Sequence, residues 1–339
     1  MKILYAIQGT GNGHISRANE IIPVLERRVT VDILMSGNES SLKLNYPIKF
    51  KLKGLTFKFG KKGNIDIIGT LLNINFIRLI KEIRSLKIDE YDLVISDFEP
   101  VSAWACIIAK KYCIGLSNQY TLLNKEVKKP NNFNFLHKIF LKYYSPVHYG
   151  YGYHYRKIQN NTFFPLIKRK IRNAKIKNLY HYTIYLPSYS VDEIIKELND
   201  IKKISFHVFS REILKESSNN NFHLKPINQN LFIKSISTCE GVICNAGFET
   251  TSEAIFLKKK LLVIPMKNQF EQKFNALCLK KLGFVTLKKL KKEDVKHWIK
   301  NKKNINIDFE QNTEEIVDRI LLDYIKRLPK VPILQNSIN

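Results

Sequence analysis

A glycine-rich turn near the start of the chain combines residues that could hold an anion and move a proton. An apolar run, Lys2 to Gln8, leads into the sequence GTGNGH at residues 9–14, where a helical pattern begins. The loop glycines, Gly9, Gly11 and Gly13, let a ligand approach the backbone, and exposed amides at a helix N-terminus attract negative charge. His14 could act there as a general base near neutral pH. A purely structural turn is the alternative interpretation.

Asp97 is a candidate partner for this histidine. It ends a second apolar run, Asp92 to Asp97, and is followed by Phe-Glu-Pro. The carboxyl ends of parallel strands share one edge of a sheet, so Asp97 and His14 are expected on the same edge. A carboxylate there could orient the imidazole and stabilise its protonated form. Alternatively, Asp97 caps the next helix, which Pro100 near the helix start would suit.

The second half of the chain carries two further segments of strand, polar turn and helix, at 245–254 (NAGFETTSEA) and 261–275 (LLVIPMKNQFEQKFN). Gly247, Thr250 and Thr251 would present amides and hydroxyls at a helix N-terminus, which suits a diphosphate. The Glu253 carboxylate could accept two hydrogen bonds from a ribose diol. Side chains such as Gln269, Glu271 and Gln272 are of the kind that read sugar hydroxyls. Each residue alone is more often a helix cap; the ordered set favours a ligand site.

These motifs lie on apolar runs that alternate with helical patterns in two series, and 339 residues suit two domains. The first series predicts strands at 2–8, 29–36, 48–52, 92–97 and 113–118, and helices at about 14–28, 71–86 and 101–111. The second predicts strands at 183–187, 205–209, 241–245 and 261–265, helices at 191–198, 249–257 and 269–282, and a closing helix after Asn312. We therefore expect an α/β protein of two doubly wound, Rossmann-like domains, 1–165 and 180–325, facing a cleft.

The composition is strongly basic, and much of the excess charge is local. Lys and Arg number 56 against 30 Asp and Glu, which gives a formal charge of +26. Residues 127–191 contain no acidic residue but hold ten of the 16 tyrosines and twelve cations: Lys128, Lys129, Lys138, Lys142, Arg156, Lys157, Lys168, Arg169, Lys170, Arg172, Lys175 and Lys177. Biased coding would explain a diffuse lysine excess but does not explain this clustering.

A helical pattern from Asn134 to Tyr144 gives this segment an amphipathic element. Phe135, Leu136, Ile139 and Phe140 are expected on one side, with Lys138 and Lys142 on the other. Basic residues beside aromatics are typical of a helix at a membrane interface. We define Lys138, Lys142, Arg156 and Lys157 as the basic surface, a candidate contact for an anionic membrane. An ordinary core-facing helix is an equal alternative, and nucleic acid ranks third because no known binding module is visible.

The segments at 245–254 and 261–275 resemble the donor-binding signature of the GT-B glycosyltransferases. The resemblance is to the UDP-sugar-dependent branch, with the plant-type UDP-glycosyltransferases and the bacterial peptidoglycan N-acetylglucosaminyltransferase, and it is strongest over 1–28, 91–118 and 239–284. It implies that Gly247, Thr250 and Thr251 contact the donor diphosphate, Glu253 the ribose, and Gln269 and Gln272 the sugar, with Glu271 and Asn245 in the same donor-binding set. Gln269 replaces an acidic residue of many relatives, and Asn245 replaces a histidine of the plant enzymes.

On the acceptor side, the resemblance makes His14 the general base and Asp97 its partner. The implied reaction is an inverting transfer of a hexosyl or N-acetylhexosaminyl group from a nucleotide donor, with UDP expected, to a lipid-linked or cell-envelope polysaccharide acceptor. Because the sequence has no D-x-D motif, we expect it to need neither a metal nor another cofactor. A non-hydrolysing UDP-sugar 2-epimerase on the same fold and a basic anion- or nucleic-acid-binding protein remain alternatives.

Other features bound the class and location of the protein. The third glycine of the amino-terminal loop comes one residue too early for the G-x-G-x-x-G fingerprint, which disfavours a nicotinamide-dependent dehydrogenase. The five cysteines include no C-x-x-C pair, and no apolar run approaches the ~18 residues of a spanning helix. We therefore expect a cytoplasmic protein that binds peripherally to the inner face of the cytoplasmic membrane.

Overall fold

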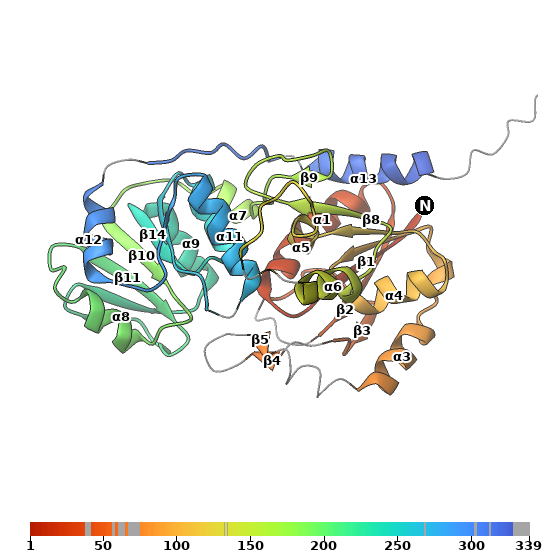
Figure 1. Ribbon diagram of the computed structural model, residues 1–339, viewed down its shortest axis with the longest axis horizontal. Coiled ribbons are helices and arrows are strands. Elements are labelled where there is room, and N and C mark those ends of the chain that lie inside the picture. Colours follow the sequence, from red (N-terminus) through yellow and green to blue (C-terminus); the bar gives the residue numbers. More distant parts are fainter. Residues whose placement is uncertain are drawn as a thin grey trace, which may run out of the picture.

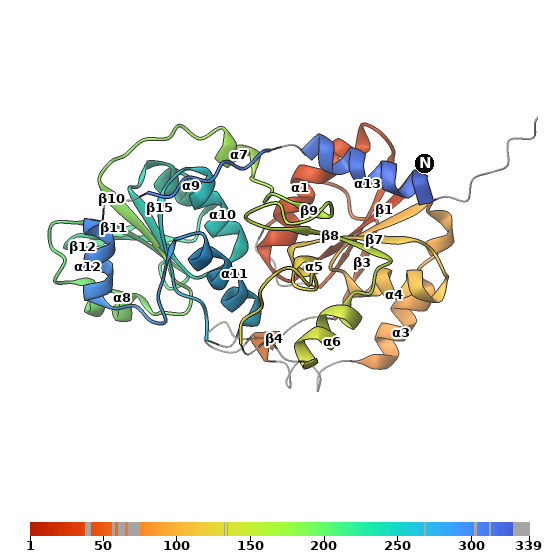
Figure 2. The same ribbon diagram turned by 45° about the horizontal axis from the view of Figure 1, so that its top comes forward.

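Two parallel-dominated sheets of seven strands each, with helices on both faces, form two lobes (Figure 1; turned by 45° in Figure 2). This computed structural model describes residues 1–37, 42–55, 58–59, 65–66, 75–131, 133, 135–267, 269–301, 304–311 and 313–327. The predicted α/β class with two doubly wound domains is confirmed. None of the helices in these ranges combines the length and apolar character that a membrane crossing requires.

The first sheet has the strand order β3-β2-β1-β6-β7-β8-β9, and all its pairs are parallel. Its strands are β1 (Lys2–Gln8), β2 (Thr30–Ser36), β3 (Phe50–Leu52), β6 (Leu93–Asp97), β7 (Cys113–Leu116), β8 (Tyr149–Tyr153) and β9 (Thr162–Phe163). Its helices are α1 (Asn12–Glu26), α3 (Phe76–Ser85), α4 (Pro100–Ile108), α5 (Asn118–Thr121) and α6 (Phe135–Tyr144), with a 3₁₀ turn at Ile88–Glu90 and a small hairpin of β4 (Lys58–Phe59) and β5 (Ile65–Asp66). The strand order reverses between β1 and β6, the point where open α/β sheets bind ligands.

The second sheet has the order β12-β13-β11-β10-β14-β15-β16, and its only antiparallel strand in the described ranges is β12 at the edge. The strands are β10 (His181–Tyr185), β11 (Ser205–Ser210), β12 (Ser217–Asn219), β13 (Phe222–Pro226), β14 (Gly241–Cys244), β15 (Lys260–Val263) and β16 (Val285–Thr286). The helices are α7 (Arg169–Arg172), α8 (Val191–Leu198), α9 (Gln229–Thr238), α10 (Phe248–Phe256), α11 (Phe270–Lys281) and α12 (Lys292–Lys300). The adjacent strands β14 and β15 place the starts of α10 and α11 side by side.

The closing helix α13 (Thr313–Arg327) returns to the first lobe and packs on α1 (Figure 1). Arg28 Nε lies 2.7 Å from Asp318 Oδ1, and the Tyr324 hydroxyl donates to the Asp92 carbonyl oxygen at 2.7 Å. The predicted range 180–325 for the second domain thus includes a helix that packs on the first. Helical periodicity gives the apolar face of α13 but not the lobe that covers it. The expected cap, Asn312, lies outside the described residues.

One other predicted element differs from the structure, and one strand was not predicted. The helix expected at 71–86 begins at Phe76, where the Asn75 side chain accepts the Arg78 amide at 2.9 Å; residues 71–74 lie outside the described ranges. The tyrosine-rich stretch of the basic segment is the buried strand β8, with Tyr151 and Tyr153 in the core. These aromatic residues therefore stabilise the first lobe and do not form a binding surface.

The glycines of β8 make room for α5. A Cβ atom at Gly150 would lie 3.0 Å from Tyr120 Cγ, and one at Gly152 would overlap the Thr121 side chain and lie 2.9 Å from the Thr121 nitrogen. The alternation of glycine and tyrosine therefore lets α5 approach one face of the strand while the tyrosines pack on the other. Because α5 starts with residues that reach the cleft, this packing also fixes part of the site.

We predict that Gly152→Ala destabilises the first lobe by about 1–3 kcal/mol, because the added methyl group meets backbone that cannot move aside. The melting temperature, followed by circular dichroism, should fall by several degrees. Gly247→Ala is the matched control, since a Cβ there meets no atom within 4 Å in the described part of the chain. Equal melting temperatures for both variants would contradict the packing described here.

Candidate active site

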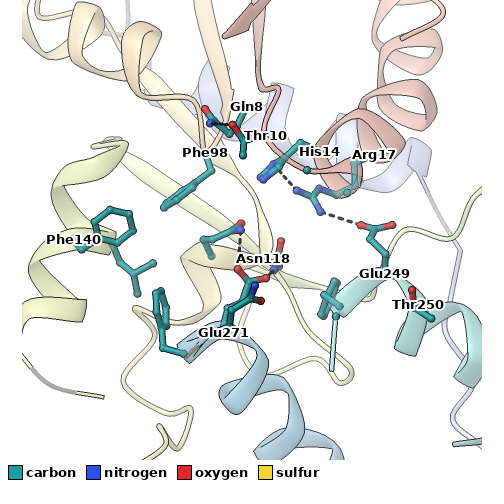
Figure 3. A pocket seen from close by; sticks show the side chains of 18 residues that line it. Gln8, Thr10, His14, Arg17, Phe98, Asn118, Phe140, Glu249, Thr250 and Glu271 are labelled. Carbon is teal, nitrogen blue, oxygen red and sulfur yellow. Dashed lines mark hydrogen bonds and ion pairs between the residues drawn. The ribbon is translucent and has the colours of Figure 1, made fainter. Parts of the chain in front are cut away.

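A cavity of about 270 Å³ lies between the two lobes, at the carboxyl edges of both sheets (Figure 3). Its walls come from the first loop and α1, from the residue after β6, from α5 and α6, and from the starts of α10 and α11. The lining residues are Gln8, Thr10, Gly11, Gly13, His14, Arg17, Phe98, Asn118, Gln119, Phe140, Leu141, Gly247, Phe248, Glu249, Thr250, Gln269, Phe270 and Glu271. Seven of the sequence-predicted site residues are among them: Gly11, Gly13, His14, Gly247, Thr250, Gln269 and Glu271.

His14 and Asp97 meet at the edge of the first sheet. Strands β1 and β6 are neighbours, with Ile7 opposite Asp97, so the turn after β1 passes directly over the end of β6. His14 Nδ1 lies 2.7 Å from Asp97 Oδ1. A neutral imidazole that donates its Nδ1 proton to this oxygen keeps Nε2 as its basic nitrogen. The geometry is therefore that of an oriented base.

The capping alternative for Asp97 is wrong, because Glu99 caps α4. The Glu99 carboxylate accepts the amides of Val101 at 2.8 Å and Ser102 at 2.7 Å. Phe98, between Asp97 and Glu99, has a positive φ of 56°, which is unusual for a residue with a bulky side chain. This turn directs the Asp97 carboxylate toward α1 and the Phe98 ring into the cavity, where it stacks on Tyr144 at 4.9 Å.

Arg17, which the sequence interpretation missed, is the third member of this cluster. Its Nη2 and Nε lie 2.8 and 3.2 Å from the two oxygens of Asp97, and its side chain is 4% exposed. Nη2 also lies 2.9 Å from His14 Nδ1. Position 17 is three residues after His14, and residues at this spacing share a helix face, so the helical pattern could have indicated it.

The cations keep the buried Asp97 ionised. Burial by itself would raise the pKa of this carboxyl, but the neighbouring charges of Arg17 and His14 outweigh burial and lower the pKa to about 2. The pKa of Arg17 is raised, because its carboxylate neighbours outweigh the opposite effect of burial. The cluster thus holds a fixed negative charge behind the imidazole.

The cavity is also faced by the N-termini of helices from both lobes. Glycines occupy the N-cap positions of α1, at Gly11, and of α10, at Gly247, and Gln269 precedes α11. Gly11 has a φ of 96°, which glycine adopts at no steric cost. Backbone amides at such ends carry partial positive charge, so the cavity suits an anionic group.

Two bridges join the lobes across the cavity. Arg17 Nη1 lies 3.1 Å from Glu249 Oε1 of α10, as drawn in Figure 3. The Glu271 carboxylate of α11 accepts the side-chain amides of Asn118 at 2.8 Å and Gln119 at 3.2 Å. Sequence reasoning expected Glu271 among the sugar-reading residues; here it lines the cavity while joining α11 to α5.

Four residues that were predicted to contact ligand make packing or turn contacts within the protein. Thr251 is fully buried, and its hydroxyl lies 2.7 Å from the Tyr155 hydroxyl and 2.8 Å from the Gly247 carbonyl oxygen. Asn245 donates to the Ile264 carbonyl oxygen at 2.7 Å, and Gln272 Oε1 accepts the Met266 amide at 3.0 Å. A Cβ at Gly9 would lie 2.6 Å from the Gly37 oxygen, so Gly9 permits close backbone packing. These positions support the loops that carry the site.

Glu253 is buried and paired with Lys168, which lies just before α7. Lys168 Nζ lies 2.7 Å from Glu253 Oε1, and the Glu253 side chain is only 4% exposed. Burial lowers the pKa of Lys168, but the charges of Glu253 and Glu249 outweigh it, so the pKa is raised. The carboxylate predicted to bind a ribose thus already has a cationic partner.

The four residues of the basic surface are all exposed but differ in their surroundings. On α6, Lys138 and Lys142 are exposed beside Phe135, which is 73% exposed, and Ile139. Phe135 and Ile139, which the core-facing alternative would bury, therefore lie partly in solvent. Lys157 is 2.8 Å from Glu310, and Arg156 is exposed. Asn134 and the Leu136 side chain lie outside the described part of the structure.

Comparison with known proteins establishes the family. Residues 1–302 match the profile described as glycosyl transferase family 1. The chain belongs to this family. The glycosyltransferase of kitacinnamycin superposes with a TM-score of 0.61 at 11% identity over 96% of this chain and 95% of its own. Comparison with curated protein sequences finds no match.

Two other solved structures show the same GT-B fold. MurG of Acinetobacter baumannii aligns with a TM-score of 0.59 at 12% identity, covering 95% of this chain and 99% of its own. Arabidopsis thaliana UGT89C1, solved with UDP, aligns with a TM-score of 0.57 at 13% identity over 94% of each chain. The predicted resemblance to GT-B glycosyltransferases is confirmed, and the protein is a glycosyltransferase.

We predict that Asp97 makes folding stability sensitive to acid. Its pKa, lowered from 3.8 to about 2, means that the ionised group stabilises the folded state above pH ~4 and that this contribution is lost as the pH falls toward 2. The contribution is about 2 kcal/mol. The free energy of unfolding of Asp97→Asn, measured by denaturant titration between pH 5 and 2.5, should therefore change less with pH than that of the wild type. Asp192→Asn, at an exposed position of α8, should keep the wild-type slope.

Proposed function

We propose that this glycosyltransferase is an inverting, metal-independent enzyme that uses His14 as its general base. The observation that carries the proposal is the cavity itself. An oriented imidazole on the first lobe faces the N-termini of α10 and α11 on the second. A base and an anion-binding wall on opposite sides suit a reaction in which a hydroxyl attacks and a diphosphate leaves.

The proposed step follows from these positions. His14 Nε2 takes the proton of an acceptor hydroxyl as its oxygen bonds to the anomeric carbon of the donor sugar. The bond from that carbon to the diphosphate oxygen breaks on the opposite face, and the diphosphate departs with the electron pair. Asp97 stabilises the imidazolium that forms. The backbone amides at Gly247 and the hydroxyl of Thr250 would stabilise the charge that develops on the leaving group.

We propose a UDP-sugar as the donor and a hexosyl or N-acetylhexosaminyl group as the transferred sugar. UDP is the ligand of the Arabidopsis neighbour, and Gln269 of this chain stands at the cavity beside Glu271. Glu253 would bind the ribose diol on releasing Lys168, since one buried carboxylate can exchange an ammonium for two hydroxyl donors. The exchange would free a lysine for the donor's own phosphates.

The acceptor side favours a lipid-linked or cell-envelope acceptor at a membrane surface. Phe98, Phe140 and Leu141 give that side of the cavity an apolar wall. The outer surfaces nearby are also apolar: Phe135, Ile139 and Tyr143 on α6 are 73%, 36% and 49% exposed, and Phe76, Ile77 and Ile80 on α3 are 59%, 83% and 49% exposed. The intervening α4 packs on α3 and donates from Trp104 Nε1 to the Tyr143 carbonyl oxygen of α6 at 3.1 Å.

Exposed apolar side chains interleaved with lysines suit an interface of anionic lipid. Lys138 and Lys142 flank Ile139 on α6, and each cation near such a surface contributes about 1 kcal/mol. We therefore propose that the enzyme works in the cytoplasm and docks peripherally on the inner face of the cytoplasmic membrane.

We predict that His14→Ala loses about 10²- to 10⁴-fold in kcat but keeps its affinity for the donor, because the base acts only in the chemical step. Transfer from UDP-, GDP- and dTDP-linked sugars should be measured in parallel with donor binding by calorimetry. A fully active His14→Ala enzyme would rule out the base. Thr250→Ala is the complementary variant and should weaken donor binding.

We also predict that the protein sediments with vesicles containing phosphatidylglycerol but not with vesicles of phosphatidylcholine alone, because docking needs both apolar insertion and charge. Ile139→Ser combined with Phe135→Ser should reduce sedimentation at least severalfold. Leu214→Ser is the matched control, since Leu214 is 88% exposed on the other lobe. Equal losses in both variants would place the contact elsewhere.

A further inference from the structure

Arg17 contacts both halves of the site, and the mechanism above gives it no role. On the first lobe it binds Asp97 and approaches His14; across the cavity it reaches Glu249 of α10 (Figure 3). Its side chain is only 4% exposed. A guanidinium at such a position is expensive to bury unless its hydrogen bonds are used.

The first consequence concerns the orientation of Asp97. Arg17 Nε and Nη2 approach the two carboxylate oxygens at 3.2 and 2.8 Å, a forked geometry that fixes the plane of the carboxylate. Oδ1 of that carboxylate also accepts from His14 at 2.7 Å. Arg17 therefore fixes the oxygen that in turn fixes the imidazole. A lysine could supply the charge but not the fork.

The second consequence concerns charge. Arg17 Nη2 lies 2.9 Å from His14 Nδ1, so its cation opposes protonation of the imidazole, whereas Asp97 favours it. A base must be neutral before it can accept a proton. The cation of Arg17 therefore acts on the His14 ring in the opposite sense to the carboxylate behind it.

The third consequence links the lobes. Glu249 lies in the first turn of α10, and its Oε1 is 3.1 Å from Arg17 Nη1. A Cβ at position 13 would lie 3.2 Å from Glu249 Oε1, so Gly13 leaves space for this carboxylate. The negative charge of Glu249 offsets part of the Arg17 cation. The charge balance at His14 therefore includes a group from the donor-side lobe.

We propose that Arg17 is a positioning residue of the transfer reaction, which orients Asp97 and His14, places a cation beside the His14 ring, and links both to α10 through Glu249. The inference rests on the proposed role of His14 as base. Among the described residues, the cluster is also faced by Tyr5 on β1, Tyr153 on β8 and Lys168, whose charge acts on Glu249. Burial raises the pKa of both phenols, so they stay neutral near pH 7. Ser117, just before α5, accepts from Nη2 at 3.3 Å.

The test compares Arg17→Gln and Arg17→Lys with the wild type in the full chain. The imidazole of His14 is followed by NMR as a function of pH, with His14→Gln used to assign its signals. Arg17→Gln removes a cation beside the ring, so the titration of His14 should move to a higher pH than in the wild type. Arg17→Lys keeps a charge, so the shift should be smaller.

Activity supplies a second readout. In Arg17→Gln the acidic limb of the pH profile of kcat/KM should move to higher pH by the same amount. In both variants kcat should fall about 10- to 100-fold, with the donor KM little changed, because orientation of the base is lost. Arg27→Gln is the matched control: Arg27 lies at the end of the same helix, is 62% exposed and pairs with Glu314 of α13. It should change neither readout.

Glu249→Gln gives a prediction of opposite sign. It removes a negative charge from Arg17, so His14 should titrate at a lower pH than in the wild type, by less than the change in Arg17→Gln. A merely structural role for Arg17 would not shift the two variants in opposite directions. Unshifted titration, or a shift of the same sign in both, would overturn the proposal.

Failure of the proposed function remains distinguishable from failure of this inference. If the wild type transfers no sugar, the base assignment fails, while the NMR titrations still report the charge coupling among Arg17, Asp97 and Glu249. If Arg17→Gln does not fold, as judged by circular dichroism, Arg17→Lys and Glu249→Gln carry the test, because both retain a cation beside Asp97.

Discussion

The ionised carboxylate of Asp97, buried without exposure to solvent, is the constraint on which the site depends. A charge in that position is unstable unless a cation and hydrogen-bond donors lie against it, and α1 supplies the guanidinium of Arg17 and the imidazole of His14. This requirement dictates the rest of the arrangement. The loop after β1 must turn directly into α1, α1 must cross the end of β6, and the turn after Asp97 must leave its carboxylate facing α1.

The same constraint explains why the lobes are packed so closely. Arg17 binds Asp97 on the first lobe through Nε and Nη2, and its remaining nitrogen, Nη1, donates to Glu249 of the second lobe. Tyr155 and His154, from the chain that leaves β8, reach further across the boundary and contact Thr251 and Cys278. The cavity is therefore bordered by polar bridges near its centre and by buried packing behind it. Its shape depends on both lobes being in place.

Much of this could be predicted from the sequence, because the decisive signals are local. Three local patterns each predict a strand followed by a helix: the glycine loop, the run that ends in Asp97 and the segment at 245–254. Adjacent parallel strands then bring the ends of these strands together. The pairing of His14 with Asp97 follows from that rule. The expectation of a GT-B enzyme came from the resemblance of these motifs to a known family, because hydrophobic periodicity alone could not provide it.

What the sequence leaves open depends on three-dimensional packing. A threonine at a helix start can face a ligand or its own backbone, and Thr251 faces its backbone and Tyr155. Tyrosines in a basic stretch can lie on a surface or in a core, and β8 buries them. The spacing of Arg17 from His14 could have indicated their shared helix face, but its contact with Glu249, 232 residues away in the sequence, could not be read from that pattern.

The return of α13 to the first lobe has a mechanical consequence. Because the chain leaves that lobe near residue 165 and re-enters it before Thr313, two covalent connections join the donor-side lobe to the first lobe. A lobe held at two points can swing about the line joining them, but its twisting about other axes is restricted. Any change in the separation of α10 from α1 must therefore be accommodated by both connections together.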